Sequence, residues 1–138
     1  MAVTGIGHLA LAVSDMKKAT DFYCGILGFK LVFDIKDSNG KPWINYLRVA
    51  PDQFVELFYP AGEAKPDGVK RVGYSHVCFV VDDIHKTTEE VLARGGVLDR
   101  PIKLGIDGNY QCWFVDPDGN RMEFMQITSE SPHAKFGK

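Results

Sequence analysis

The alternation of apolar and polar positions predicts a strand near the N-terminus, and the same pattern returns in the second half of the chain. Residues 5–13 form a strand pattern that carries one histidine, His8, and both of its faces are mostly apolar. Such a strand is normally covered on both sides, so the histidine is expected to point inward. The segment 74–83, YSHVCFVVDD, matches 6–15, IGHLALAVSD, and places His76 on His8. An internal repeat of this kind predicts two equivalent modules.

In both copies the strand leads into a helical pattern. Apolar residues between 16 and 27 fall on one stripe of a helix that Ser14 or Asp15 can cap, and Gly28 follows as a left-handed stop. The second copy has a capping aspartate at 82 or 83 and a glycine stop at 95–96. Further strands are expected at 29–35, 43–49 and 54–59 in the first copy, and at 97–99, 110–115 and 121–127 in the second.

These elements predict an α+β fold built from two βαβββ modules. Module 1 is expected at about 5–60 and module 2 at about 73–127, with a linker rich in turn residues at 61–72 and a flexible tail at 128–138. At 138 residues the chain has the length of one domain, so the two modules are expected to share a core.

Composition narrows the function classes. A formal net charge of −2 and a pI near 6.1 provide no basic surface for nucleic acid. No apolar run approaches the roughly 20 residues that cross a bilayer, and the N-terminus lacks a signal-peptide pattern. We therefore expect neither nucleic acid nor a membrane as partner. Cys24, Cys78 and Cys112 show no CxxC spacing and are expected to be reduced, as in a cytoplasmic protein.

Two glutamates occur inside apolar strands at matching distances from the two histidines. Glu56 in FVELF lies 48 residues after His8, and Glu123 in RMEFM lies 47 residues after His76. Two imidazoles and two carboxylates are a recurrent ligand set for a divalent metal. Alternatively, both glutamates lie on a solvated face and both histidines are hydrogen-bonded core residues. The match between the repeats favours the metal site. In addition, a buried carboxylate without a partner would cost several kcal/mol, so a glutamate that points into the sheet needs a cation or another strong partner.

These features carry a resemblance to a known family. The strand-borne His8 and His76, the helix ending in DFYCGILGF and the DPDGNRMEFM hairpin resemble the vicinal-oxygen-chelate superfamily over residues 5–127. Within this superfamily, the glutamate at position 56 makes the chain similar to glyoxalase I (lactoylglutathione lyase). The resemblance implies two half-barrel sheets flanked by helices. It also implies a homodimer in which His8 and Glu56 of one chain meet His76 and Glu123 of the other.

The resemblance further implies a chemistry. His8, Glu56, His76 and Glu123 would hold nickel, cobalt or zinc, and Glu56 and Glu123 would serve as base and proton donor on an enediolate. The substrate would be a small α-hydroxycarbonyl or its thiol adduct.

The glutathione-binding positions depart from the family. An arginine and an asparagine hold the glutathione carboxylates in bacterial glyoxalase I, and the matching positions here are Ala12 and Pro60. Neither can make a charge-assisted hydrogen bond. Glutathione dependence is therefore left open. Pocket residues are expected among those that offer amides, aromatic faces or a cation: Trp43, Asn45, Lys103, Asn109, Gln111 and Trp113.

Other functions are compatible with the same superfamily. A ring-cleaving dioxygenase would use Fe(II) with His8 or His76 and Glu123. An epimerase is a further alternative. A non-catalytic binding or resistance protein would hold a small molecule without converting it. Such binding proteins often lose metal ligands, and this chain retains all four candidates, which favours an enzyme.

Overall fold

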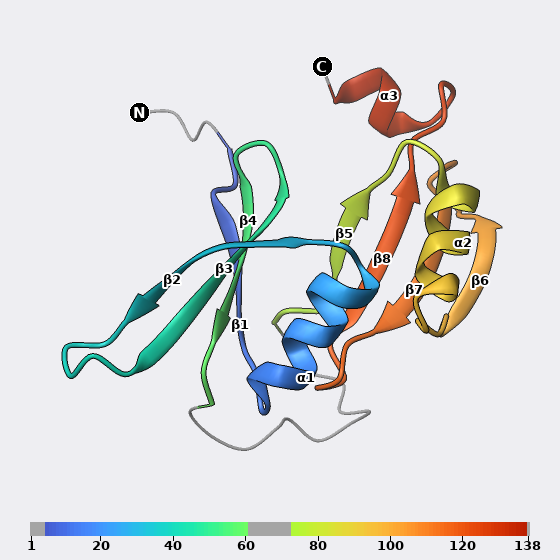
Figure 1. Cartoon of the computed structure of the whole chain (residues 1–138). Helices are drawn as coiled ribbons and strands as arrows, with labels where there is room; N and C mark the ends of the chain where they lie inside the picture. The colour runs from blue at the N-terminus through green and yellow to red at the C-terminus, as the bar shows by residue number, and fades with distance from the viewer. Residues whose placement is uncertain (1–4, 61–72, 138) are drawn as a thin grey trace. The chain divides into compact units, whose positions relative to one another are not determined.

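A computed structural model describes residues 5–60 and 73–137 (Figure 1). The chain divides into two compact units between residues 65 and 66. Each unit has its own four-stranded sheet, and together they confirm the expected α+β fold with two βαβββ modules. The predicted linker at 61–72 lies outside the described residues. Within the described ranges, no helix is long and apolar enough to cross a membrane.

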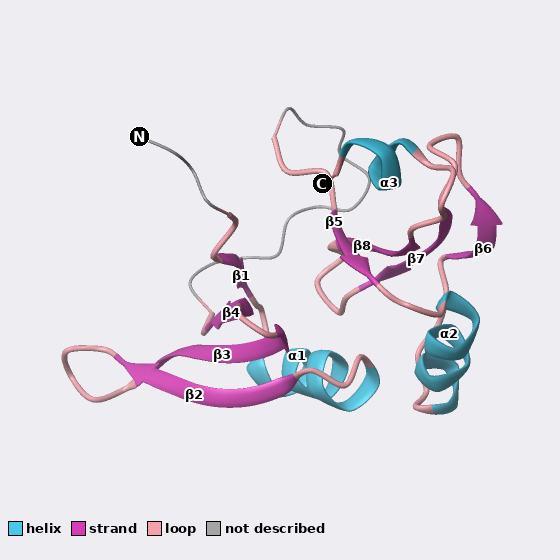
Figure 2. Cartoon of the chain, turned by 90° about the horizontal axis from the view of Figure 1, so that it is seen from above, coloured by secondary structure: helices cyan, strands magenta, loops and turns pink. Residues whose placement is uncertain are grey.

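The first unit follows the predicted order of elements. Its sheet has the strand order β1-β4-β3-β2, in which β1 runs parallel to β4 and the other neighbours are antiparallel. In Figure 2 the pair β2–β3 forms a long hairpin. The elements are β1 (His8–Ala12), α1 (Met16–Thr20), a π-helical continuation η1 (Asp21–Ile26), β2 (Lys30–Lys36), β3 (Pro42–Ala50) and β4 (Gln53–Phe58).

The second unit repeats this topology. Its strand order is β5-β8-β7-β6, and again the first strand is parallel to the last while the others are antiparallel. As in the first unit, a helix follows the first strand and precedes the others (Figure 2). The elements are β5 (Val77–Val80), α2 (Ile84–Ala93), β6 (Arg100–Leu104), β7 (Tyr110–Val115), β8 (Arg121–Gln126) and α3 (Pro132–Phe136).

The helix ends use the predicted caps. The Asp15 carboxylate accepts a hydrogen bond from the Lys18 backbone N–H at 3.0 Å, and Asp83 does the same for Lys86. Each cap satisfies one of the unpaired N–H groups of a first helical turn. Gly28 has a φ of 81°, a left-handed value that favours glycine after the helix.

The hydrophobic core of each unit lies between one face of its sheet and its helix. In the first unit α1 packs on β4, and in the second α2 packs on β7 and β8. Strand alternation places Leu57 on the helix side, where it is fully buried, and Glu56 on the other side. The core side chains include Leu11, Val13, Tyr23, Leu47, Val55 and Leu57 in the first unit, and Ile84, Val91, Cys112, Phe114, Met122 and Phe124 in the second.

One prediction about the first strand is wrong. His8, Ala10 and Ala12 were expected to be covered, yet this face of β1 is exposed, whereas Leu11 is buried. Alternation of residue types identified two apolar faces, but only the face that carries Leu11 is buried. The other face is the one that carries the histidine.

The strand expected at 97–99 is also misplaced. The structure has β6 at Arg100–Leu104, and Asp99 contributes only a backbone N–H that donates to the Trp113 carbonyl at 2.8 Å. β6 contains a proline, Pro101, which lacks a backbone N–H. It is tolerated because β6 is the edge strand of its sheet, where a missing N–H breaks no interior ladder.

The segment after β8 contains regular structure that the sequence did not predict. Ser131 caps α3 by accepting from the Ala134 N–H at 3.3 Å, and its hydroxyl donates to the Thr128 carbonyl at 3.0 Å. The Thr128 hydroxyl donates to the Gly108 carbonyl at 2.7 Å. These bonds connect the C-terminal segment to the β6–β7 turn. The expected flexibility of residues 128–138 stays a prediction.

Replacing Leu57 by alanine should destabilise the protein by about 2–5 kcal/mol, because a fully buried side chain is lost and a cavity remains. The matched control is Leu92→Ala on α2, whose side chain is 47% exposed and should cost less than about 1 kcal/mol. Urea unfolding followed by circular dichroism measures both. Equal losses in the two variants would contradict the assigned core.

Candidate metal centre

The first His–Glu pair is positioned by the parallel pairing of β1 and β4. The register sets Ala10 opposite Glu56, so His8 stands two residues before the residue that faces the glutamate. This offset brings His8 Nε2 to 3.5 Å from Glu56 Oε2. The carboxylate is buried, with 6% of its side chain exposed, whereas half of the imidazole is exposed. The first pair therefore combines a half-exposed imidazole with a buried carboxylate.

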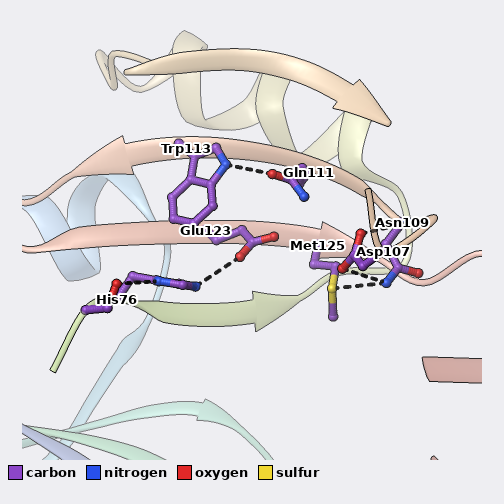
Figure 3. A network of polar contacts seen from close by, with 8 residues as sticks. His76, Asp107, Asn109, Gln111, Trp113, Glu123 and Met125 are labelled. Atoms are coloured by element: carbon purple, nitrogen blue, oxygen red, sulfur yellow. Dashed lines mark hydrogen bonds and ion pairs between the residues drawn. The ribbon is translucent and has the colours of Figure 1, made fainter. Parts of the chain in front are cut away.

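The second pair is built in the same way. Cys78 lies opposite Glu123 in the parallel pair β5–β8, and His76 again stands two residues earlier. His76 Nε2 is 3.4 Å from Glu123 Oε2, as Figure 3 shows. Glu123 has 8% of its side chain exposed and His76 has 35%. The sequence repeat is therefore reproduced in the geometry of the two pairs.

The separation of the donor atoms suits a shared ion better than a tight hydrogen bond. Hydrogen bonds between nitrogen and oxygen cluster near about 2.9 Å. Two ligands bound to zinc at about 2.1 Å with tetrahedral angles lie about 3.4 Å apart. The observed 3.4 and 3.5 Å match this second value. Each pair thus has the donor types and the spacing of two adjacent ligands.

Within the described part of the chain, no group of three or more His, Cys, Asp or Glu side chains is close enough to hold a metal. Each unit supplies two candidate ligands. A site with four protein ligands would therefore need both pairs.

Glu123 lies in surroundings that oppose its negative charge. Burial raises the pKa of the Glu123 carboxyl above its usual value, and the nearby negative charge of Asp107 adds to this. His76 and the thiol of Cys78 act in the opposite direction and lower the pKa of Glu123. Burial, together with the adjacent Glu123 carboxylate, raises the pKa of the Cys78 thiol to about 12. Cys78 is therefore a neutral thiol that donates to the carboxylate.

Glu56 has a different neighbour, which sequence reasoning missed. Tyr46 lies directly opposite Glu56 in the antiparallel pair β3–β4. The phenol hydrogen-bonds to Glu56, and this bond is the main reason why the pKa of Tyr46 is raised. The ring stacks on Phe33 with centroids 4.2 Å apart. Counting 67 residues back from Trp113, the same interval as between Glu123 and Glu56, would have identified this position.

Two of the predicted pocket residues stand beside the second pair. Trp113 lies opposite Glu123, and its ring meets the His76 ring edge-on with centroids 4.7 Å apart. The indole N–H donates to the Gln111 side-chain oxygen at 2.9 Å (Figure 3). The amide of Gln111 in turn lies against Gly105, where a Cβ atom would collide with it. Trp113 and Gln111 therefore have fixed positions next to Glu123.

Asn109 and Asn45 have other surroundings. Asn109 is fully buried, and its amide N–H groups donate to Asp107 and lie 2.9 Å from His133 Nδ1, while its oxygen accepts from the Thr128 N–H. This side chain anchors the C-terminal segment to the β6–β7 turn. Asn45 lies opposite Leu57, so alternation places it on the helix side of the sheet, away from Glu56. Neither arrangement supports the predicted contact with substrate.

The remaining predicted pocket residues are exposed. Trp43 is 47% exposed and meets Phe58 edge-on with centroids 5.9 Å apart. Lys103 is an exposed residue of the edge strand β6 and pairs with Gln111. Lys103 thus borders the face that carries the second pair, and its role stays a prediction.

Comparisons with known proteins agree with this architecture. A model of the Glyoxalase/Bleomycin resistance protein/Dioxygenase superfamily matches residues 5–124. A lactoylglutathione lyase from Haemophilus influenzae is 31% identical over 126 residues, which cover 88% of this chain and 92% of that protein.

Solved structures show the same fold. A glyoxalase family protein from Enterococcus faecalis has a TM-score of 0.76 at 23% identity, with 88% of this chain and 97% of that one covered. TnmS3, an antibiotic binding protein from Streptomyces, has a TM-score of 0.70 at 26% identity, with coverages of 93% and 99%.

The raised pKa of Glu123 predicts a pH-dependent stability in the metal-free protein. Below the usual glutamate range the acid is neutral in both folded and unfolded states. As the pH rises, the unfolded chain ionises more readily than the folded one, so stability is lost. The glutamine of Glu123→Gln carries no charge at any pH, so this variant does not lose stability in this way. The thermal midpoint of the variant minus that of the unmodified protein should therefore increase between about pH 4 and about pH 7.

The control for this measurement is Glu89→Gln, which removes an exposed carboxylate of α2. Its midpoint difference should stay nearly constant over the same range. Both variants are measured by scanning calorimetry in the presence of a chelator. A Glu123→Gln difference that falls as the pH rises would contradict the buried, charge-opposing environment.

Proposed function

Because the chain belongs to the Glyoxalase/Bleomycin resistance protein/Dioxygenase superfamily, we propose that it is a metal-dependent lyase or isomerase of the glyoxalase I type. The observation that carries this proposal is the pair of His–Glu contacts at equivalent positions of the two units. Each combines a buried carboxylate with a half-open imidazole. A relative at 31% identity is a lactoylglutathione lyase, which supports the reaction class.

The proposed metal ligands are His8, Glu56, His76 and Glu123. Their mixed nitrogen and oxygen donors fit nickel, cobalt or zinc and do not distinguish between these ions. When bound, such an ion polarises a substrate carbonyl and stabilises the negative charge that develops on its oxygen. The two buried carboxylates need a cationic partner, and the half-open imidazoles leave the face accessible to a small ligand.

The proposed proton transfer uses the two glutamates. Either Glu56 or Glu123 removes the proton next to the carbonyl of a small α-hydroxycarbonyl or its thiol adduct, and the proton is returned at the neighbouring carbon. Burial opposes the charge of Glu123, and this increases its tendency to accept a proton. Trp113 stands opposite Glu123 on the neighbouring strand, and its ring packs against His76.

A second candidate function is the binding of a small molecule without conversion. The similarity to TnmS3, an antibiotic binding protein, favours it. Retention of all four candidate ligands favours the enzyme. Metal content and turnover separate the two, since a binding protein would retain its ligand without exchanging protons.

The decisive measurement is metal analysis of the purified protein, followed by deuterium exchange from solvent into a panel of α-hydroxycarbonyls. Glu123→Gln should lower exchange by about 10² to 10⁴, because a base is lost, and should also weaken metal binding. Glu89→Gln is the matched control and should leave both unchanged. Full exchange activity in Glu123→Gln would refute the assigned role. Iron with oxygen uptake on catechols would identify a dioxygenase instead.

The proposed homodimer with shared sites can be tested by mixing two inactive variants. One lacks the first pair (His8→Ala with Glu56→Gln), and the other lacks the second pair (His76→Ala with Glu123→Gln). If sites combine pairs from two chains, each mixed dimer regains one complete site, so random mixing restores about one quarter of the activity. If each site belongs to a single chain, no activity returns, and sharing between chains is wrong.

A further inference from the structure

Arg121 has an unusual position next to the second His–Glu pair. Its guanidinium carbon lies 4.7 Å from the centre of the Trp113 ring. The His76 ring centre is also 4.7 Å from that of Trp113. The guanidinium and the imidazole therefore share one aromatic neighbour and lie no farther apart than twice this distance. Strand alternation places Arg121 on the same face of β8 as Glu123.

The charge of Arg121 is not neutralised by a carboxylate within residues 5–60 and 73–137, since its side chain takes part in none of the ion pairs there. The acid at the start of the adjoining turn, Asp116, is used by the turn itself. Its oxygens accept from the Asp118 and Asn120 N–H groups and from the Asn120 side chain at 2.8–2.9 Å. Stacking on a ring leaves the in-plane donors of a guanidinium available.

The repeat indicates that this cation is not required by the fold. The position equivalent to Arg121 in the first unit, 67 residues earlier, is Phe54, and the equivalent of Trp113 is Tyr46. The two positions occupy the same places in the two sheets. The same backbone is therefore built with a phenylalanine in one unit and an arginine in the other. Arg121 is therefore available for a role outside folding.

We propose that Arg121, held in place by Trp113, binds an oxyanion of the substrate, a carboxylate or a phosphate. The inference rests on the proposed function and narrows its substrate class to anionic α-hydroxycarbonyls. A guanidinium matches the two oxygens of such a group with parallel hydrogen bonds, and these are stronger than neutral ones. Ala12 and Pro60 provide no charge at the positions that hold the glutathione carboxylates in the family, so an anion would have to be recognised elsewhere. In the first unit Arg48 is an exposed cation, and it is the alternative tested below.

The test compares three substrates that differ in one group: glyceraldehyde, glyceraldehyde 3-phosphate and tartronate semialdehyde. Deuterium exchange from solvent gives kcat/KM for each with the metal-loaded protein. Arg121→Gln should lower kcat/KM for the anionic compounds by about 10- to 100-fold and change the neutral one by less than about threefold. Arg121→Lys should recover part of the loss, because it keeps the charge without the planar fork. The ratio of the phosphate and carboxylate effects identifies the preferred oxyanion.

Two other variants provide the controls. Lys86→Gln removes an exposed charge of α2 and should have no effect on any substrate. Arg48→Gln removes the exposed cation that pairs with Phe54 in the first unit. If Arg48→Gln reproduces the selective loss and Arg121→Gln does not, the assignment is wrong. An equal loss on neutral and anionic substrates in Arg121→Gln also overturns it.

A binding measurement separates this inference from the proposed function. Inorganic phosphate and malonate are titrated into the metal-loaded protein by calorimetry, which needs no turnover. Binding of either anion that is lost in Arg121→Gln and kept in Lys86→Gln supports the site even if no substrate exchanges. The absence of binding to the unmodified protein, or equal binding by both variants, refutes it.

Discussion

The structure depends on two carboxylates that are buried in apolar sheets and face a half-exposed imidazole each. An ionised glutamate in such surroundings costs several kcal/mol unless it has a cationic partner or hydrogen-bond donors. Glu56 has His8 and the Tyr46 hydroxyl, and Glu123 has His76 and the Cys78 thiol. The other face of each sheet is covered by a helix and forms the core. The two faces therefore have separate roles, since one stabilises the fold and the other carries the candidate metal ligands.

Parallel pairing of the first and last strand of each unit makes these contacts. Because β1 pairs with β4, and β5 with β8, a histidine near the start of one strand reaches a glutamate two residues further along its neighbour. A shift of one residue would turn the glutamate towards the helix and remove the contact. The helical crossover and the hairpin that follow the first strand thus determine the site as well as the fold. The equal offset in both units explains why the His–Glu spacing in sequence is nearly the same.

Local chemistry in the sequence was sufficient to predict the order of elements up to β8, a helix cap at 14 or 15 and at 82 or 83, and the His–Glu pairs, because each depends on nearby residues or on the repeat. Contacts that depend on register were harder to predict. Tyr46 was missed, because its position opposite Glu56 follows from strand pairing. Asn109 was taken for a pocket residue, although distant segments occupy its amide. The predicted strand at 97–99 was misplaced, because the bounds of the edge strand β6 follow from its pairing with β7.

The two His–Glu pairs share a backbone arrangement but not an environment, and this difference has a chemical consequence. Opposite Glu56 stand Ala10 and Tyr46, and opposite Glu123 stand Cys78 and Trp113. Tyr46 hydrogen-bonds to Glu56. Burial raises the pKa of Glu123, Asp107 adds to this, and His76 and the Cys78 thiol act against it. A phenol stands beside one acid, whereas a thiol, an indole and a guanidinium stand beside the other. In the proposed shared site, two identical pairs would offer a substrate two equivalent orientations. The different side chains beside the two pairs would give an asymmetric substrate one preferred direction.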